Sequence, residues 1–171
     1  MAAFSDDPET LQRVDWRLLQ NGPVTLYWRP EYMRQDVECL EAHGYLIHHF
    51  DVTDWNDLTK MHGEFQSKLA FPSYYGKNLD ALNDCLSDIA IPNDAGTALT
   101  FAHFDSLIAT QPTVAAALLD ILADNSRRAM LFGKRLIALV QTDSPDLRTG
   151  PIGATTGNWN CREWLDSNRK L

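Results

Sequence analysis

The chain has 171 residues, of which 44% are hydrophobic and five are tryptophan, so it can bury a substantial core and is not globally disordered. Its net charge is −8, and the whole excess lies in the first 90 residues, which carry 15 acidic and seven basic side chains. Such a surface repels a phosphate backbone, which argues against direct nucleic-acid binding, and attracts a basic protein.

The first 52 residues predict two helices and two strands. In chain order these are a helix over 10–20, a strand over 23–28, a helix over 31–44 and a strand over 45–52. Asn21-Gly22 and Gly44 are typical stops for the two helices. A strand, a helix and a strand with short joints form a βαβ unit, for which we expect a right-handed parallel crossover.

The middle of the chain continues this alternation. It predicts a helix over 55–69, a short helix that begins at Asn78, a strand over 97–104, a long helix over 112–131 and a strand over 134–141. Thr53 or Asp54 is a candidate cap for the first of these helices, and we expect the long helix to break near Asn125.

From Thr142 onward the composition shifts to Thr, Pro, Gly and Asn, which predicts a surface loop. The loop ends in NCREWLD, a short segment that we expect to dock Trp164 on the domain. The whole pattern predicts one α/β domain over 1–171, with a mainly parallel sheet of about four strands and helices packed around it.

The stretch PSYYGKNLDALNDCLSD, residues 72–88, contains the strongest local signal. In its helix the apolar residues Leu79, Leu82 and Leu86 share one side, and three aspartates follow a single stripe on the outer side: Asp80, Asp84 and Asp88. Like charges at this spacing cost a few tenths of a kcal/mol each. The stripe is therefore either a solvated face or a face for a positively charged partner.

Motifs for common cofactor and metal chemistry are missing from the sequence. It contains no glycine-rich phosphate loop between a strand and a helix, no CxxC, no HExxH and no GxSxG, so no cofactor or metal is predicted. His48 and His49 point to opposite faces of a predicted strand, which does not suit ligation of one metal. Asp80 and Asp84, with His103 as a base at a strand end, stay open as a carboxylate-dependent hydrolase.

The compartment is predicted from cysteine usage and from the absence of targeting signals. The three cysteines, Cys39, Cys85 and Cys161, are widely separated and odd in number, which favours a reducing compartment. No apolar run reaches the roughly 18 residues of a membrane span, and the start MAAFSDDPE is too acidic for a signal peptide. We expect a cytoplasmic protein without a membrane partner.

Residues 74–85 resemble the signature of the barstar family of ribonuclease inhibitors, YYG-x-NLDAL-x-DC, at ten fixed positions in a twelve-residue window. The order of predicted elements over 45–141 is also similar to the barstar-like fold. The resemblance therefore divides the chain into an N-terminal strand–helix extension (1–44), a barstar-like core (45–141) and a C-terminal loop and tail (142–171).

The resemblance implies a non-enzymatic inhibitor, with an antitoxin or immunity role, whose YYG loop and acidic helix plug the active site of a basic ribonuclease or ribonuclease toxin. Asp84 matches the central anion of the family, and Asp80 a second charged contact. The implied partner-binding residues are Tyr74, Gly76, Asn78, Asp80, Asn83, Asp84, Ser87, Asp88 and Asp124. The family prototype carries a tryptophan at the position of Asn83, a departure that bears on partner identity. A module that binds a basic non-nuclease protein through the same face remains an alternative.

Overall fold

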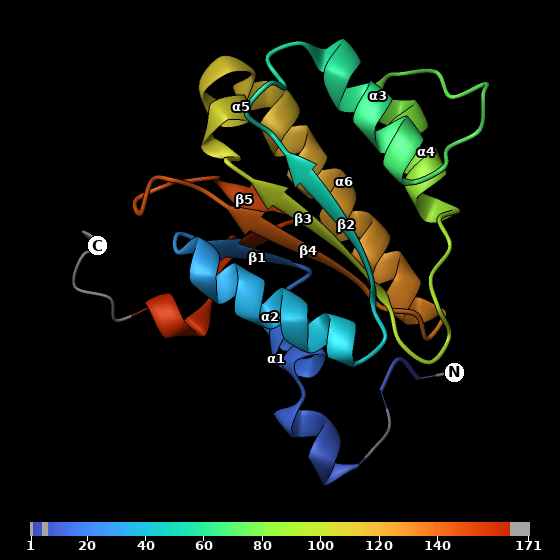
Figure 1. Ribbon diagram of the computed structural model, residues 1–171, viewed down its shortest axis with the longest axis vertical. Coiled ribbons are helices and arrows are strands. Elements are labelled where there is room, and N and C mark those ends of the chain that lie inside the picture. The colour runs from blue at the N-terminus through green and yellow to red at the C-terminus, as the bar shows by residue number, and fades with distance from the viewer. Residues whose placement is uncertain (1, 5–6, 165–171) are drawn as a thin grey trace.

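The computed structural model describes residues 2–4 and 7–164. Its main sheet contains β1 (Val24–Tyr27), β2 (Leu46–Asp51), β3 (Thr97–Ala102), β4 (Leu136–Gln141) and β7 (Asn158–Trp159). The strand order is β2-β3-β4-β1-β7, and all neighbouring strands are parallel. The predicted α/β class with a mainly parallel sheet is confirmed, with five strands instead of about four (Figure 1).

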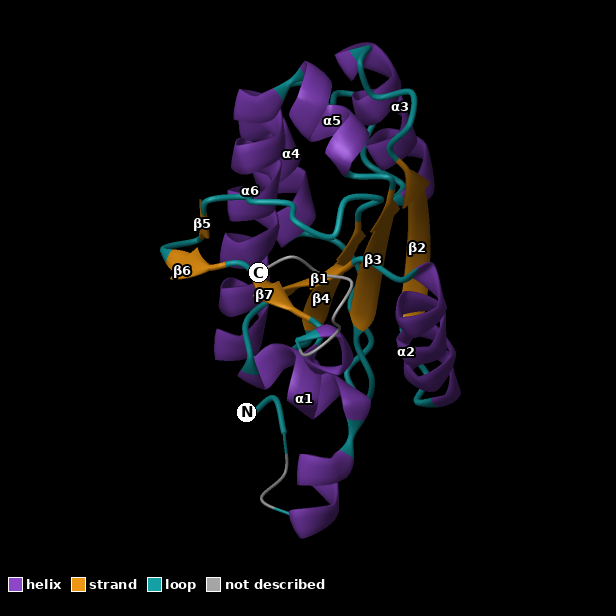
Figure 2. Ribbon diagram, turned by 90° about the vertical axis from the view of Figure 1, so that its left-hand side faces the viewer, coloured by secondary structure: helices purple, strands orange, loops and turns teal. Residues whose placement is uncertain are grey.

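Helices cover both faces of this sheet (Figure 2). The α-helices are α1 (Val14–Gln20), α2 (Pro30–Ala42), α3 (Leu58–Lys68), α4 (Leu79–Ser87), α5 (Asp105–Thr110) and α6 (Pro112–Leu131). The 3-10 helices are η1 (Pro8–Gln12) and η2 (Cys161–Glu163), and a small antiparallel hairpin contains β5 (Pro151–Ile152) and β6 (Thr155–Thr156).

Alternate residues of the strands build two separate cores. In β4, Leu136, Ala138 and Val140 face the core under α3, α4, α5 and α6, whereas Ile137 and Leu139 face the core under α1 and α2. This alternation is what a strand buried on both faces requires, and it explains the continuous apolar sequence of β4. The molecule therefore has three layers, with the sheet in the middle.

The strand order explains which helices lie on which face. The chain steps from β2 to β3 to β4 in one direction along the sheet, but it moves from β1 to β2 in the opposite direction. When crossovers keep their usual right hand, a reversed step places the connecting helix on the opposite face. This is why α2 lies across the sheet from α6. The two strands of the predicted βαβ unit, β1 and β2, are parallel but are separated by β4 and β3.

Several predicted element boundaries are wrong for local reasons. The helix predicted over 10–20 is split, because Arg13 is extended (φ −69°, ψ 145°) and its guanidinium donates to the buried Asp15 at 2.7 Å. Helix α3 begins at Leu58, where the Asp57 side chain caps it, and Thr53 and Asp54 do not. Helix α5 was not predicted, since its six residues are too few for a clear period.

The predicted break near Asn125 is also wrong, because α6 continues to Leu131. The contacts of the Asn125 side chain do not interrupt the helix. Its Nδ2 donates to the Ile121 carbonyl at 2.9 Å and to Asn83 Oδ1 at 2.9 Å, so this amide joins α6 to α4.

The segment after Thr142 is more than the predicted surface loop, because it returns to the sheet and to α6. Strand β7 pairs with β1, with Trp159 opposite Leu26. The β5–β6 hairpin rests on α6, where Arg127 donates to the Gly153 carbonyl and the Gly153 N–H donates to Asp120 at 2.6 Å. The segment after Thr142 is thus held by β1, near the start of the chain, and by α6.

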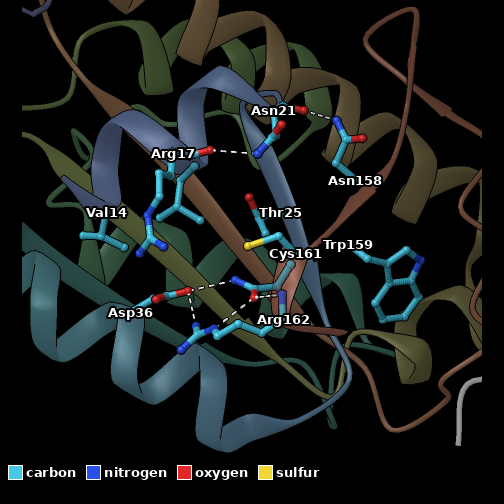
Figure 3. A pocket seen from close by; sticks show the side chains of 11 residues that line it. Val14, Arg17, Asn21, Thr25, Asp36, Asn158, Trp159, Cys161 and Arg162 are labelled. Carbon is cyan, nitrogen blue, oxygen red and sulfur yellow. Dashed lines mark hydrogen bonds and ion pairs between the residues drawn. The ribbon is translucent and has the colours of Figure 1, made fainter. Parts of the chain in front are cut away.

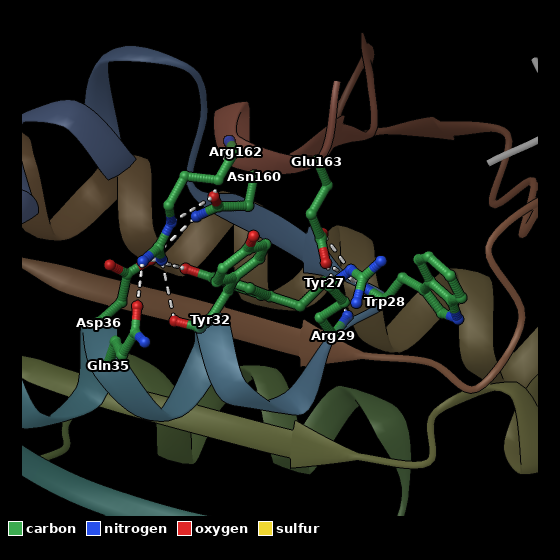
Figure 4. A network of polar contacts seen from close by, with 9 residues as sticks. All are labelled: Tyr27, Trp28, Arg29, Tyr32, Gln35, Asp36, Asn160, Arg162 and Glu163. Carbon is green, nitrogen blue, oxygen red and sulfur yellow. Dashed lines mark hydrogen bonds and ion pairs between the residues drawn. The ribbon is translucent and has the colours of Figure 1, made fainter. Parts of the chain in front are cut away.

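Glu163 docks the end of the tail more deeply than the predicted Trp164. Trp164 is 47% exposed and its Nε1 donates to the Trp159 carbonyl of β7 at 2.7 Å, while Glu163 is fully buried. The Glu163 carboxylate accepts the backbone N–H of Trp28 at 3.1 Å and of Arg29 at 2.6 Å, at the start of α2 (Figure 4). A carboxylate in this position satisfies free N–H groups and favours the helix dipole.

A second buried carboxylate, Asp36 on α2, binds the tail at Asn160 and Arg162. It accepts hydrogen bonds from Tyr27 Oη at 2.7 Å, Asn160 Nδ2 at 2.9 Å and the Arg162 guanidinium at 2.6 Å (Figure 4). Burial beside the Asp36 charge raises the pKa of Tyr27 well above its ordinary value, which keeps the phenol as the donor.

A third buried carboxylate connects the N-terminal segment to the rest. Asp15 on α1 accepts hydrogen bonds from Arg13, from Tyr45 at 2.9 Å and from the buried Arg135 at 3.2 Å. Burial alone would raise the pKa of Asp15, but the hydrogen bonds from Arg13 and Tyr45 outweigh it and hold that pKa below its usual value.

Candidate functional site

The acidic helix α4 begins where the sequence predicts. Asn78 is its N-cap, with extended backbone (φ −137°, ψ 171°), and its side chain accepts the Ala81 N–H at 2.8 Å. Lys77, just before the cap, has φ +50°, a left-handed conformation that a lysine adopts only at a cost. The turn at Lys77 and the cap at Asn78 together set the direction in which α4 leaves the loop.

The inner face of α4 holds the helix firmly on the fold. Leu82 and Leu86 are 0% and 1% exposed and belong to the same core as α6. Cys85 is half-buried beside them. Its burial, and then the neighbouring charges of Asp84 and Asp88, raise the pKa of the thiol, which disfavours the reactive thiolate form.

The outer face of α4 carries the three aspartates, Asp80, Asp84 and Asp88, all exposed. Within residues 2–4 and 7–164 no ion pair involves any of the three. Three unneutralised carboxylates on an anchored helix form a rigid anionic surface, which suits a cationic partner.

The two tyrosines of the preceding loop have different roles. Tyr75 is 5% exposed, and its hydroxyl lies 2.5 Å from Nδ1 of the buried His62, so it anchors the loop on α3. Burial lowers the pKa of His62, helped by the charge of Lys77, and the neutral ring suits this contact. Tyr74 is 85% exposed, so the loop presents one tyrosine to solvent beside the acidic stripe.

The structure places most of the predicted partner-binding residues on this exposed surface. Those exposed on the loop and α4 are Tyr74, Gly76, Asn78, Asp80, Asp84, Ser87 and Asp88. Asn83 differs, because it is half-buried and its Oδ1 accepts from Asn125 of α6. Asp124 lies on α6, exposed but paired with Arg128 at 2.9 Å.

Sequence patterns did not reveal a groove beside this surface. It has a volume of about 340 Å³ and lies between the C-terminal ends of α4 and α6. Its lining residues include Ile89, Asn125, Arg128, Phe132 and Lys134. The exposed aromatic at position 132, which follows a run of amphipathic helix, was the one signal that could have indicated it.

The hydrolase alternative finds little support in the arrangement of its candidate residues. His103, at the carboxyl end of β3, has Nδ1 2.8 Å from Asp143 Oδ2, and this hydrogen bond is the main reason why the pKa of His103 is raised. The contacts described for His103 are to Gln141 and Asp143, whereas Asp80 and Asp84 point to solvent from α4. The structure does not bring the proposed acid, base and histidine together.

The place where doubly wound sheets usually bind ligands is occupied by the chain itself. Such sites lie where neighbouring strands send their connections to opposite faces, here at the carboxyl ends of β4 and β1. At this point the N-terminus of α2 is already bound by Glu163. A cavity nearby, lined by Thr25, Asp36 and Arg162 among others, has a volume of about 30 Å³, enough for one water molecule (Figure 3).

Across residues 2–4 and 7–164, no group of three or more His, Cys, Asp or Glu side chains is arranged to hold a metal ion. In the same residues, no helix combines the length and the apolar character needed to cross a bilayer.

Comparison with known proteins identifies the region that contains this surface. Residues 45–141 match the family model described as Barstar (barnase inhibitor). A stretch of 37 residues is 49% identical to "Putative ribonuclease inhibitor YrdF" of Bacillus subtilis (strain 168), covering 22% of this chain and 41% of that protein. The chain thus matches less than half the length of this relative.

Among solved structures, this chain matches part of a Walker-type ATPase of Pyrococcus abyssi with a TM-score of 0.42 and 13% identity. The similarity covers 80% of this chain and 45% of that one. A similarity this low does not define a common fold or activity.

Proposed function

This chain belongs to the barstar family of barnase inhibitors, and we propose that it inhibits a basic ribonuclease or ribonuclease toxin by placing α4 and the YYG loop in the enzyme's active-site cleft. The observation that carries this proposal is the stripe of three exposed aspartates, without an ion pair among the described residues, on a helix that buries Leu82 and Leu86. The family match over residues 45–141 supports it, because these residues include the whole loop and helix.

The mechanism that we propose is occlusion by a carboxylate that replaces a substrate phosphate. Asp84, in the middle of the stripe, binds the arginines and histidine of the cleft, and Asp80 makes a second charged contact. Because α4 is anchored by Leu82 and Leu86, the carboxylates are ordered before binding, and little side-chain freedom is lost. Asn78 and Gly76 shape the loop side of the contact, and Ser87 and Asp88 extend it at the other end.

On this proposal the protein is not an enzyme, acts in the cytoplasm and protects its host as an immunity protein or antitoxin. The thiols of Cys39, Cys85 and Cys161 are free, which suits a reducing compartment. The whole of residues 1–171 acts as one domain, in which the segments outside 45–141 complete the sheet and hold α2 in place.

Titration of purified ribonucleases tests the proposal. A panel of basic microbial ribonucleases that includes barnase is mixed with the full chain, and RNA cleavage is followed at low and at high salt. We expect inhibition by the wild type, a loss of at least 30-fold with Asp84→Ala, and slower association as ionic strength rises. Glu41→Ala is the matched control, since it removes one exposed charge from α2, across the sheet.

Two outcomes would contradict the proposal. Inhibition by the wild type that Asp84→Ala leaves unchanged would exclude the acidic helix as the inhibitory element. Failure of the wild type to inhibit any ribonuclease in the panel, together with capture of a basic protein that cleaves no RNA, would favour the non-nuclease alternative.

A further inference from the structure

The groove between the ends of α4 and α6 has an apolar floor and a positive charge. Leu86, Ile89, Ile91, Ala129 and Leu136 supply apolar surface, and Arg128 and Lys134 supply the only two charged side chains in its lining. The groove begins at Ser87, so it directly continues the surface that carries the acidic stripe. The acidic stripe is polar and negatively charged, whereas the groove is mainly apolar and positively charged.

Large apolar side chains stand exposed at both ends of the acidic helix. Phe132, which lines the groove, is 75% exposed, and Leu131 beside it in sequence is 80% exposed. At the other end, Tyr74 is 85% exposed. Exposed side chains of this size are concentrated in the contact regions of binding proteins, where aromatic residues often dominate affinity.

The charges of the groove define the partner group that fits it. Arg128 is partly neutralised by Asp124 at 2.9 Å, but no ion pair of Lys134 is found in the described part of the chain. A positively charged group placed against Lys134 would be repelled. The complementary group is an acidic side chain beside an apolar one.

Asn125 is a second and independent feature of the groove wall. It is 3% exposed, and its Nδ2 donates to Asn83 and to Ile121, which fixes the separation of the two helices. Its Oδ1 is buried without a hydrogen-bond partner, and an unsatisfied buried acceptor is unfavourable.

We propose that this groove receives a loop of the same ribonuclease, with an apolar side chain against Phe132 and Ile89 and a carboxylate next to Lys134 and Arg128. The inference rests on the proposed function and adds a specificity requirement to it. The enzyme must combine a basic cleft for α4 with an acidic, apolar loop at one side of that cleft. The opposite charges of the stripe and the groove then fix the orientation in which the two proteins dock.

The test uses two groove variants and two matched controls in the full chain, with barnase and the same ribonuclease panel as probes. Phe132→Ala removes the apolar contact, with Leu11→Ala as the control for an exposed apolar side chain, since Leu11 is 57% exposed on η1. Lys134→Glu reverses the groove charge, with Arg34→Glu on α2 as its control. Dissociation constants are measured at low and at high salt.

We expect Phe132→Ala to weaken the complex about tenfold at either salt concentration. Lys134→Glu should weaken it by a similar factor at low salt and by much less at high salt, because screening removes the charge effect. The two controls should bind like the wild type. Thermal unfolding of each free variant within about 2 °C of the wild type shows that the fold is retained.

Each remaining outcome contradicts the inference in an identifiable way. If Asp84→Ala abolishes inhibition while both groove variants bind like their controls, the proposed function stands and the groove is not a contact. If Lys134→Glu strengthens the complex, the partner presents a basic group there and the predicted loop chemistry is wrong. If the wild type inhibits no ribonuclease, the proposed function fails and this inference fails with it.

Discussion

Replacing Asp84 by alanine should change stability and binding in opposite directions. In the free protein, Asp84 is exposed, has no ion pair among the described residues and lies one helical turn from both Asp80 and Asp88. Its carboxylate therefore meets two like charges and no opposite one. An interaction surface that awaits a cationic partner is expected to carry this kind of local instability.

The magnitude of the stability change follows from two terms. Relief of two like-charge contacts at i, i±4 contributes about 0.2–0.5 kcal/mol each, and the better helix propensity of alanine contributes about 0.5 kcal/mol. The unfolding free energy should therefore rise by about 1 kcal/mol, or about 3 °C in Tm for a domain of this size. Asp84→Asn removes the charge without the propensity gain, so its increase should be about half as large.

Asp84→Ala should weaken the complex with the ribonuclease, although it stabilises the free protein. Truncating one partner of a buried charge pair costs about 2–5 kcal/mol in protein interfaces, a range based on complexes that include barnase–barstar itself, the prototype of this family. Urea unfolding of the free variants and ribonuclease inhibition measure the two effects separately. A fall of more than about 1 kcal/mol in the unfolding free energy of Asp84→Ala would show that this carboxylate has an intramolecular role, and the reasoning would be refuted.

Three further predictions concern the parts that support the surface. Glu163→Ala should lower the unfolding free energy, measured by urea titration, by about 3 kcal/mol or more, because two charge-assisted hydrogen bonds to backbone N–H groups are lost. Inhibition should not change while the protein stays folded. Because burial lowers the pKa of His62 in the folded state, the unfolded chain binds more protons, so stability should fall as pH drops below about 6.5, and less steeply in His62→Gln. Lys77→Gly should raise the unfolding free energy by about 0.5–1 kcal/mol, and Tm with it, because glycine adopts φ +50° without strain. An unchanged or lower Tm would contradict this.

The sequence alone determined the elements whose signals are local. The cap at Asn78, the apolar period of α4 and the charges on its outer face all lie within eleven residues, so the helix and its orientation could be predicted without knowledge of the fold. The buried strands were predicted for the same reason, since a run such as 136–141 satisfies both faces of a sheet at once. The family motif lies in one such local stretch.

The tertiary structure decided the features that depend on residues far apart in the chain. Glu163 binds the backbone at Trp28 and Arg29, and Arg135 binds Asp15, yet no periodic pattern connects positions separated by more than 100 residues. The groove beside α4 depends on where α6 ends against it, so Phe132 looked like an ordinary helix terminus in the sequence. Local patterns determine which face of an element is buried, but packing determines what each exposed face lies beside. For this protein, the sequence alone determined the acidic helix, and the fold placed a positively charged apolar groove next to it.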